Sequence, residues 1–126
     1  HFLRPHHIAV VDAAFAASDF DARSSATGRD YLYRILARRW RAPGAEIDIV
    51  ARRGGTIVFV EVKARRSMDL AEIALTPAQR RRITRAAELF LARHPRHGGG
   101  DMRYDMILVS NGGWPRHIQG AFDADV

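Results

Sequence analysis

The clearest pattern in the chain is an alternation of apolar and charged residues in two neighbouring runs. These runs cover Glu46–Ala51 and Thr56–Ala64, and an Arg-Gly-Gly segment at 53–55 lies between them. Two such β-rich runs joined by a glycine turn are typical of a β-hairpin. Because strand side chains point alternately to opposite faces, Glu46 and Asp48 should share one face.

The same alternation assigns the other hairpin side chains to faces. Ile47 and Ile49 should lie together, opposite the two acidic residues of the first strand. The second strand should present two sets on opposite faces, namely Val58, Val60 and Val62, and then Phe59, Glu61 and Lys63. The hairpin therefore predicts that acidic residues of both strands lie near one lysine.

A helix is predicted to begin at Thr76 and to end near His94. Threonine can cap a helix, proline suits the first helical position, and Pro95 would stop the element. Apolar residues recur at helical spacing and should form its buried stripe: Ile83, Ala86, Ala87, Phe90 and Leu91.

The segments on either side of these elements are less regular. Residues 29–41 carry apolar residues at helical spacing and predict a helix that passes into a strand. Trp40 should pack on the core, with stacking on a nucleic-acid base as the alternative. Residues 103–110 and 116–122 predict two further strands.

The first 28 residues have only a weak pattern, in which a short helix near 13–17 is expected. The chain shows no repeats and no clear linker, and its length suits one domain. The order of elements therefore predicts a single domain over residues 1–126. Its expected fold is α/β, with a mixed central sheet flanked by helices.

Composition excludes several classes of protein. The hydrophobic share of 47% is that of a globular chain, and no apolar run reaches the roughly 18 residues of a membrane span. The absence of cysteine excludes disulfides and thiolate zinc sites. The first residues make a poor secretory signal. A cytoplasmic location without membrane contact is therefore expected.

The basic residues point to a polyanionic partner. The formal net charge is +6, which favours nucleic acid, although a basic protein without such a partner is an equal alternative on charge alone. The first half of the predicted helix is crowded by Arg80, Arg81, Arg82 and Arg85. Cations at this end oppose the helix dipole, so their placement favours an anionic partner.

One basic residue differs in kind from the rest. The chain has 20 lysine and arginine residues, and Lys63 is the only lysine. Lysine can take part in proton-linked chemistry for which arginine is too basic. Its position inside an apolar strand therefore indicates a chemical role, with chance placement as the alternative.

The hairpin residues match the needs of phosphodiester hydrolysis. A divalent metal held by carboxylates can activate water and neutralise charge, and a lysine can orient that water. Glu46, Asp48, Glu61 and Lys63 supply these groups on adjacent strands. An ordinary solvated hairpin face with cross-strand charge pairs is the alternative. Residue chemistry alone favours neither the hydrolytic site nor the solvated face.

A family resemblance favours the first interpretation. Asp48 followed by Glu61-Val62-Lys63 resembles the D…(E)xK pattern of the restriction-endonuclease-like superfamily. The wider sequence closely resembles the YraN-like family of bacterial proteins, which is similar to archaeal Holliday-junction resolvases. The likeness is carried, in order, by residues 39–41, 46–51, 58–65, 76–94 and 103–107.

The resemblance implies a restriction-endonuclease-like α/β/α core and a metal-dependent endonuclease that hydrolyses phosphodiester bonds in nucleic acid. It implies Mg²⁺ or Mn²⁺ held by Asp48, Glu61 and the Val62 carbonyl. Asp48, Glu61 and Lys63 would be the catalytic residues, with Glu46 in support. DNA is favoured over RNA, branched DNA is a candidate substrate, and a homodimer would suit symmetric cutting of two strands.

Two features depart from the family pattern. Ala45 stands where members usually have glycine. Members also carry an acidic residue early in their first helix, and here Asp21 and Asp30 are available without a matching context. A non-catalytic nucleic-acid-binding module with the nuclease fold is therefore the alternative function.

Several residues outside the motif are further candidates. Gln79 could support the site near the substrate, with ordinary helix surface as the alternative. Asp105 is expected to be structural, as in a buried pair with an arginine. The arginines expected to contact nucleic acid are Arg65, Arg66, Arg80, Arg81 and Arg82.

Overall fold

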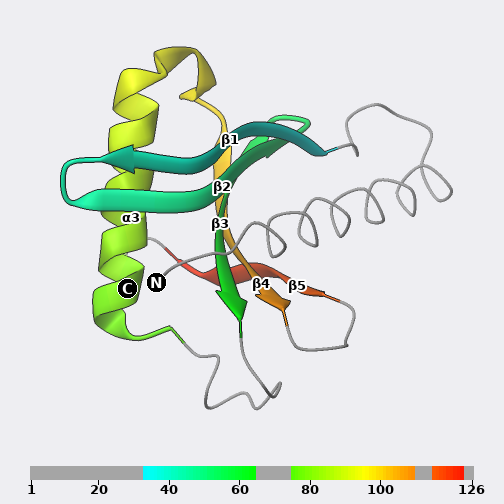
Figure 1. Cartoon of the computed structure of the whole chain (residues 1–126). Helices are drawn as coiled ribbons and strands as arrows, with labels where there is room; N and C mark the ends of the chain where they lie inside the picture. Colours follow the sequence, from blue (N-terminus) through cyan, green and yellow to red (C-terminus); the bar gives the residue numbers. More distant parts are fainter. Residues whose placement is uncertain (1–32, 65–74, 110–114, 124–126) are drawn as a thin grey trace, which may run out of the picture.

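The computed structural model describes residues 33–64, 75–109 and 115–123 of the chain. There the chain forms a five-stranded sheet with a long helix, α3, against one face (Figure 1). The elements follow in chain order: β1 (Tyr33–Ala42), β2 (Ala45–Arg53), β3 (Thr56–Ala64), α3 (Pro77–Arg93), the short 3₁₀ turn η2 (Pro95–His97), β4 (Asp101–Val109) and β5 (Arg116–Phe122).

The strand order in the sheet follows the sequence, β1-β2-β3-β4-β5. Neighbouring strands are antiparallel except β3 and β4, which are parallel. Parallel neighbours need a long crossover, and α3 lies in the connection between these two strands. The sheet is therefore mixed, which confirms the predicted α/β class and is consistent with a restriction-endonuclease-like core.

The predicted hairpin is confirmed as β2 and β3. The two strands pair from Arg53↔Thr56 to Ile49↔Val60. The three valines of β3 pack in one cluster on the face away from α3. Phe59 packs on the other face against Phe90 of α3, with ring centroids 6.0 Å apart. Alternation along β3 therefore assigns its faces correctly.

Alternation fails at one point of β2. Ile49 packs on the face away from α3, whereas Ile47 packs on the α3 face with Trp40, its partner in β1. Opposite this stretch, Arg39 of β1 has a φ of 50°, a left-handed conformation that L-residues rarely adopt. Both strands change face at this irregularity. The prediction that Ile47 and Ile49 share a face is therefore wrong.

Residues 33–41 form strand β1, so the predicted helix before a strand is wrong for the described residues. Ile35 and Leu36 suggested helical spacing because they are adjacent and apolar. In the structure they pack into clusters on opposite faces of the sheet. A register shift between Ile35 and Ala37 accompanies this arrangement, as in a β-bulge. Apolar side chains on both faces of this strand are thus packed, which explains why adjacent residues are apolar.

Helix α3 closely matches its prediction. Thr76 Oγ1 accepts a hydrogen bond from the Gln79 N–H (3.1 Å), and Gln79 Oε1 accepts one from the Thr76 N–H (2.8 Å), which makes a capping box. The buried stripe contains Ile83, Ala86, Ala87 and Phe90, with Leu91 partly buried. Among the described helices, none has the length and apolar character needed to span a membrane.

The remaining predictions concern the ends of the chain and Trp40. β4 and β5 confirm both later strands, although β4 begins two residues earlier than expected, at Asp101. Trp40 packs on the core, with its ring 5.4 Å from that of Phe90. The weakly patterned residues 1–28, including the expected helix near 13–17, lie outside the described residues.

Candidate functional site

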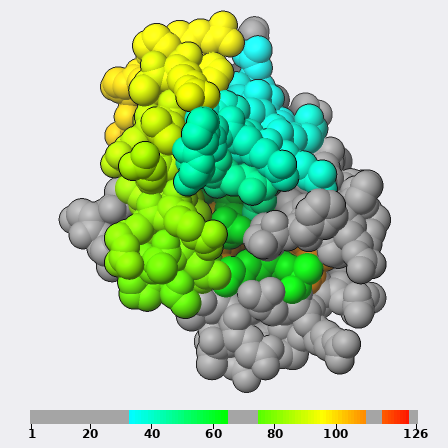
Figure 2. All heavy atoms as spheres, turned by 60° about the vertical axis from the view of Figure 1, so that its left-hand side comes forward, coloured from blue at the N-terminus to red at the C-terminus, as the bar shows by residue number. Residues whose placement is uncertain are grey.

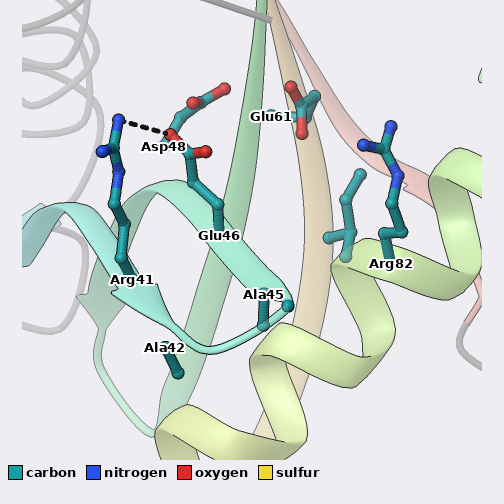
Figure 3. Close-up of a pocket in the computed structure, with 9 residues that line it drawn as sticks. Arg41, Ala42, Ala45, Glu46, Asp48, Glu61 and Arg82 are labelled. Carbon is teal, nitrogen blue, oxygen red and sulfur yellow. Dashed lines mark ion pairs between the residues drawn. The ribbon is translucent and has the colours of Figure 1, made fainter.

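A pocket of about 440 Å³ opens between the β1–β2 hairpin and the first half of α3. Figure 2 shows a hollow between these elements, with β3 at its floor. Three carboxylates line it, those of Glu46, Asp48 and Glu61 (Figure 3). The other lining residues are Arg41, Ala42, Gly44, Ala45, Arg82 and Ile83. The acidic residues singled out by the sequence therefore face one common space.

Asp48 is positioned where the β2–β3 ladder ends. Backbone pairing of the two strands stops at Ile49↔Val60, and beyond it the Val62 N–H donates to Asp48 Oδ2 at 2.8 Å. This bond offsets the cost of burying a side chain that is only 3% exposed. The N–H and C=O of a strand residue point to the same side, so the Val62 carbonyl also faces β2.

Glu61 and Lys63 reach the α3 side of the sheet from β3. Glu61 is half-buried and lines the pocket beside Ile83 of α3. Lys63 is 4% exposed and contacts Gln79 of α3. Val62, between them in sequence, packs on the opposite face. The predicted common face of Glu61 and Lys63 is therefore confirmed.

Gln79 connects Lys63 to the start of α3. Lys63 Nζ donates to Gln79 Oε1 at 3.5 Å, a long hydrogen bond. The same oxygen accepts from the Thr76 N–H at 2.8 Å, so the capping box fixes its position. This contact supports the expectation that Gln79 belongs to the site over the alternative of plain helix surface.

Glu46 lies at the rim of the pocket. Its side chain is 39% exposed and forms an ion pair of 3.5 Å with Arg41, its cross-strand partner (Figure 3). Exposed pairs of this kind contribute little to stability. Arg41 was not among the residues predicted for the site, because residues 29–41 were predicted to begin as a helix. The register of a β1–β2 hairpin would have placed Arg41 opposite Glu46.

The arginines expected to contact nucleic acid are found in different environments. Arg82 lines the pocket, and Arg81 is exposed. Arg80 is half-buried, and its Nε is buried without a hydrogen-bond partner among the described residues. Arg65 and Arg66 lie outside the described residues. Of the three arginines of this set that the structure describes, Arg82 is the one that lines the pocket with the carboxylates.

The donor atoms of the pocket suit a hard cation. In the described segments, His, Cys, Asp and Glu side chains form no group of three or more that could hold a metal ion. The three pocket carboxylates are thus spread around the opening. Mg²⁺ is usually held by one or two carboxylates and keeps several waters. Asp48 and Glu61 are the carboxylates of the pocket that could form part of such a set.

A second buried carboxylate belongs to Asp105 of β4, which is fully buried. It accepts hydrogen bonds from Arg103 Nε (2.8 Å) and Nη2 (2.9 Å), His117 Nε2 (2.7 Å) and the Gly120 N–H (3.0 Å). Burial alone would raise the pKa of Asp105, but these hydrogen bonds outweigh it and hold the pKa below its usual value. The expected structural pairing of Asp105 with an arginine is confirmed.

Known proteins match this chain over the residues that form most of the sheet, α3 and the pocket. Residues 27–109 match the model of the uncharacterised protein family UPF0102. A UPF0102 protein of Rhodopseudomonas palustris (strain CGA009) is 47% identical over 116 residues, which cover 89% of each chain. One of Bradyrhizobium diazoefficiens is 54% identical over 92 residues, covering 73% of this chain and 69% of its own length.

A further UPF0102 protein, of Bradyrhizobium sp. (strain ORS 278), is 45% identical over 120 residues, which cover 95% of this chain and 83% of its own. The region matched by the family model contains β1 to β4 and every residue that lines the pocket. The resemblance to the YraN-like family is therefore confirmed, and the chain belongs to the uncharacterised protein family UPF0102.

Proposed function

We propose that the pocket hydrolyses phosphodiester bonds in nucleic acid with a divalent metal. The observation that carries this proposal is the placement of Asp48 and Glu61 in one pocket, with the chain's only lysine buried two residues after Glu61. Neighbouring carboxylates repel one another unless a cation joins them. The D…(E)xK resemblance supports the same chemistry.

Asp48 and Glu61, with the Val62 carbonyl, would hold Mg²⁺ or Mn²⁺. Such an ion supplies an activated water and neutralises charge that develops on the phosphate. The hydrogen bond from the Val62 N–H to Asp48 Oδ2 orders the Asp48 carboxylate before any ligand arrives. A ligand group held in this way loses little conformational entropy on binding.

Lys63 would orient the attacking water or stabilise the phosphate oxygen that gains charge. A charged donor acts most strongly where water is excluded, and Lys63 is 4% exposed. Gln79 Oε1 accepts a hydrogen bond from Lys63 Nζ and is itself held by the capping box. Gln79 is thus a positioning residue for Lys63.

The surroundings of the pocket favour a polyanionic substrate. Arg82 lines the opening, and Arg81 and Arg85 are exposed on the same half of α3. Arginines placed in this way neutralise backbone phosphates without reading sequence. DNA is favoured over RNA, branched DNA is the first substrate to test, and a homodimer would allow two strands to be cut symmetrically.

The test is incubation of the purified chain with plasmid, single-stranded and four-way-junction DNA in the presence of Mg²⁺ or Mn²⁺. Cleavage is expected, and chelation should abolish it. Asp48→Asn and Lys63→Ala should each lower the rate by about 10²–10³-fold. The asparagine retains an oxygen that can accept from the Val62 N–H, so the local fold should persist.

Glu88→Gln is the matched control, because it also converts a carboxylate to an amide but lies exposed on α3 outside the pocket. It should leave the rate unchanged. Cleavage that is absent with either metal, or that survives both Asp48→Asn and Lys63→Ala, would contradict the proposal.

A second candidate is a nucleic-acid-binding module without catalysis. The exposed arginines of α3 favour it, because they can bind phosphate with no metal. This function predicts binding that weakens steeply with salt and is unaffected by chelation or by Asp48→Asn. Binding that requires both a metal and Asp48 would exclude it.

A further inference from the structure

A second group of basic residues lies beyond the other end of α3. Arg34, Arg52, Arg96 and His97 form what we call the distal basic cluster. Arg34 of β1 is the cross-strand partner of Arg52 of β2. Arg52 Nη1 lies 3.3 Å from His97 Nδ1 in η2, which follows the C-terminal end of α3 (Figure 1). Two strands and one turn therefore bring basic residues to a single place.

The members of the distal basic cluster lie close enough to repel one another. Burial lowers the pKa of His97, and the positive charges of the three arginines and of His94 lower it further. Like charges opposite each other on paired strands are unfavourable. In the part of the chain that the structure describes, the three arginines form no ion pair with a carboxylate. The cluster thus has an excess of positive charge.

Ordinary structural causes explain only part of this arrangement. A helix C-terminus favours nearby cations, which accounts for Arg96 and His97 after α3. A charged residue on an edge strand discourages aggregation, which accounts for Arg34. Neither cause explains Arg52, because β2 is an inner strand and this arginine lies opposite Arg34 while its Nη1 donates to the neutral Nδ1 of His97. An external polyanion would neutralise all of them together.

Arg52, at the centre of the cluster, is held in place by the backbone around it. Arg52 Nε donates to the Gly54 carbonyl at 3.1 Å. A Cβ added at Gly100 would lie 2.6 Å from the Gly55 carbonyl oxygen, so the loop after η2 packs directly on the β2–β3 turn. Charges fixed before binding lose little conformational entropy when a ligand arrives. This favours a binding surface over scattered solvated arginines.

Strand β1 sets the distance between the cluster and the pocket. Arg34 and Arg41, which lines the pocket, lie seven positions apart on this strand. At about 3.3 Å per residue the separation is roughly 23 Å. A duplex strand advances about 3.4 Å per nucleotide, so this length corresponds to about seven nucleotides. One polynucleotide can therefore reach both places.

We infer that the distal basic cluster binds the phosphate backbone of the same nucleic acid whose phosphodiester enters the pocket, about seven nucleotides away from it. This inference rests on the proposed function for its substrate class. The cluster would contribute affinity and orientation without reading sequence, because its donors are phosphate contacts. It would also make binding depend on the length of the nucleic acid.

Binding to DNA duplexes in chelator, measured at several salt concentrations, tests this inference. Each phosphate contact adds roughly 0.9 to the slope of log affinity against log salt. Arg34→Gln should lower that slope by about 0.9, and Arg34→Gln with Arg96→Gln by about 1.8. Arg116→Gln is the matched control, because it removes one exposed arginine from the edge strand at the other side of the sheet.

The expected result is a reduced slope for both cluster variants on duplexes of about 24 base pairs, with Arg116→Gln like the parent. Duplexes of about six base pairs cannot reach the cluster and the pocket together, so the parent should bind them much more weakly than the long duplex. An unchanged slope on the long duplex overturns the inference and leaves the pocket proposal standing. A reduced slope without cleavage in metal supports the cluster while the pocket proposal fails.

Discussion

Two buried carboxylates of this protein, Asp48 on β2 and Asp105 on β4, have different surroundings. Asp105 is enclosed by Arg103, His117 and the Gly120 N–H, which together give it four hydrogen bonds. Asp48 is nearly as buried, but it lines a pocket that two further carboxylates also line. Their environments, and not their burial, distinguish them.

The comparison separates a structural charge from a chemical one. A buried charge enclosed by its counter-charge strongly resists removal of either partner. We propose that Asp48, a buried charge that lines an opening beside like charges, serves to hold a cation from outside, and such functional sites often reduce stability. Removal of the charge should therefore lower mainly the stability at Asp105 and mainly the activity at Asp48.

The largest expected effect on stability is that of Asp105→Ala. Removing this carboxylate leaves Arg103 and His117 without their buried partner, which should cost about 3–5 kcal/mol of unfolding free energy. Asp48→Asn should change it by less than about 1 kcal/mol, because a hydrogen bond to Val62 is retained. Urea unfolding of both variants measures the difference, and equal losses would contradict the distinction.

The pH dependence of stability should follow Asp105. Burial raises its pKa, but the hydrogen bonds from His117, Arg103 and Gly120 lower it more, so its pKa is lower in the folded chain. Such a group stabilises the fold above its unfolded pKa of about 3.9, and the contribution is lost as pH falls through the folded pKa. Stability should therefore fall below about pH 4.

Asp105→Asn tests this origin, because the amide does not titrate. Urea unfolding between neutral and acid pH should show a shallower decline below about pH 4 for the variant than for the parent. A decline of the same steepness in both proteins would assign the acid sensitivity to other groups.

The smallest effects concern the start of α3. Thr76→Ala and Gln79→Ala each break the capping box and should each cost about 1 kcal/mol of unfolding free energy. Only Gln79→Ala also removes the acceptor of the Lys63 ammonium group. We expect it to lower the cleavage rate by about 10-fold, as loss of a supporting contact does, while Thr76→Ala leaves the rate near that of the parent.

The two variants distinguish loss of stability from loss of Lys63 positioning, because Thr76→Ala breaks the capping box and leaves the acceptor of Lys63 in place. Unfolding free energies and single-turnover rates should be measured on both proteins. Equal rates for Thr76→Ala and Gln79→Ala would show that the contact with Lys63 has no part in the reaction.

Local patterns were sufficient to predict much of this fold. The glycine turn and the alternation in β3 placed its valines on one face and Glu61 with Lys63 on the other. Threonine followed by proline located the start of α3. In each case the deciding interactions lie within one element or between sequence neighbours, where periodicity and capping are informative.

The wrong predictions depended on pairing between β1 and β2. Ile35 and Leu36 imitate a helical pattern because both faces of β1 are apolar here, and a register shift brings Leu36 and Ala37 into the same cluster. Ile47 changes face beside Arg39, which has a left-handed backbone. An arginine gives no signal in the sequence that its backbone will adopt this conformation. Arg41 joins the pocket only through that same register. Irregular strand pairing is set by tertiary packing, which a single-sequence pattern does not contain.

The most direct test of the account is titration of the purified chain with Mn²⁺ by calorimetry. The account predicts one bound ion per chain, lost in Asp48→Asn and in Glu61→Gln and retained in Glu88→Gln, which changes a carboxylate outside the pocket. Binding that is absent from the parent chain, or that both pocket variants retain, would contradict the assignment of these carboxylates to a metal.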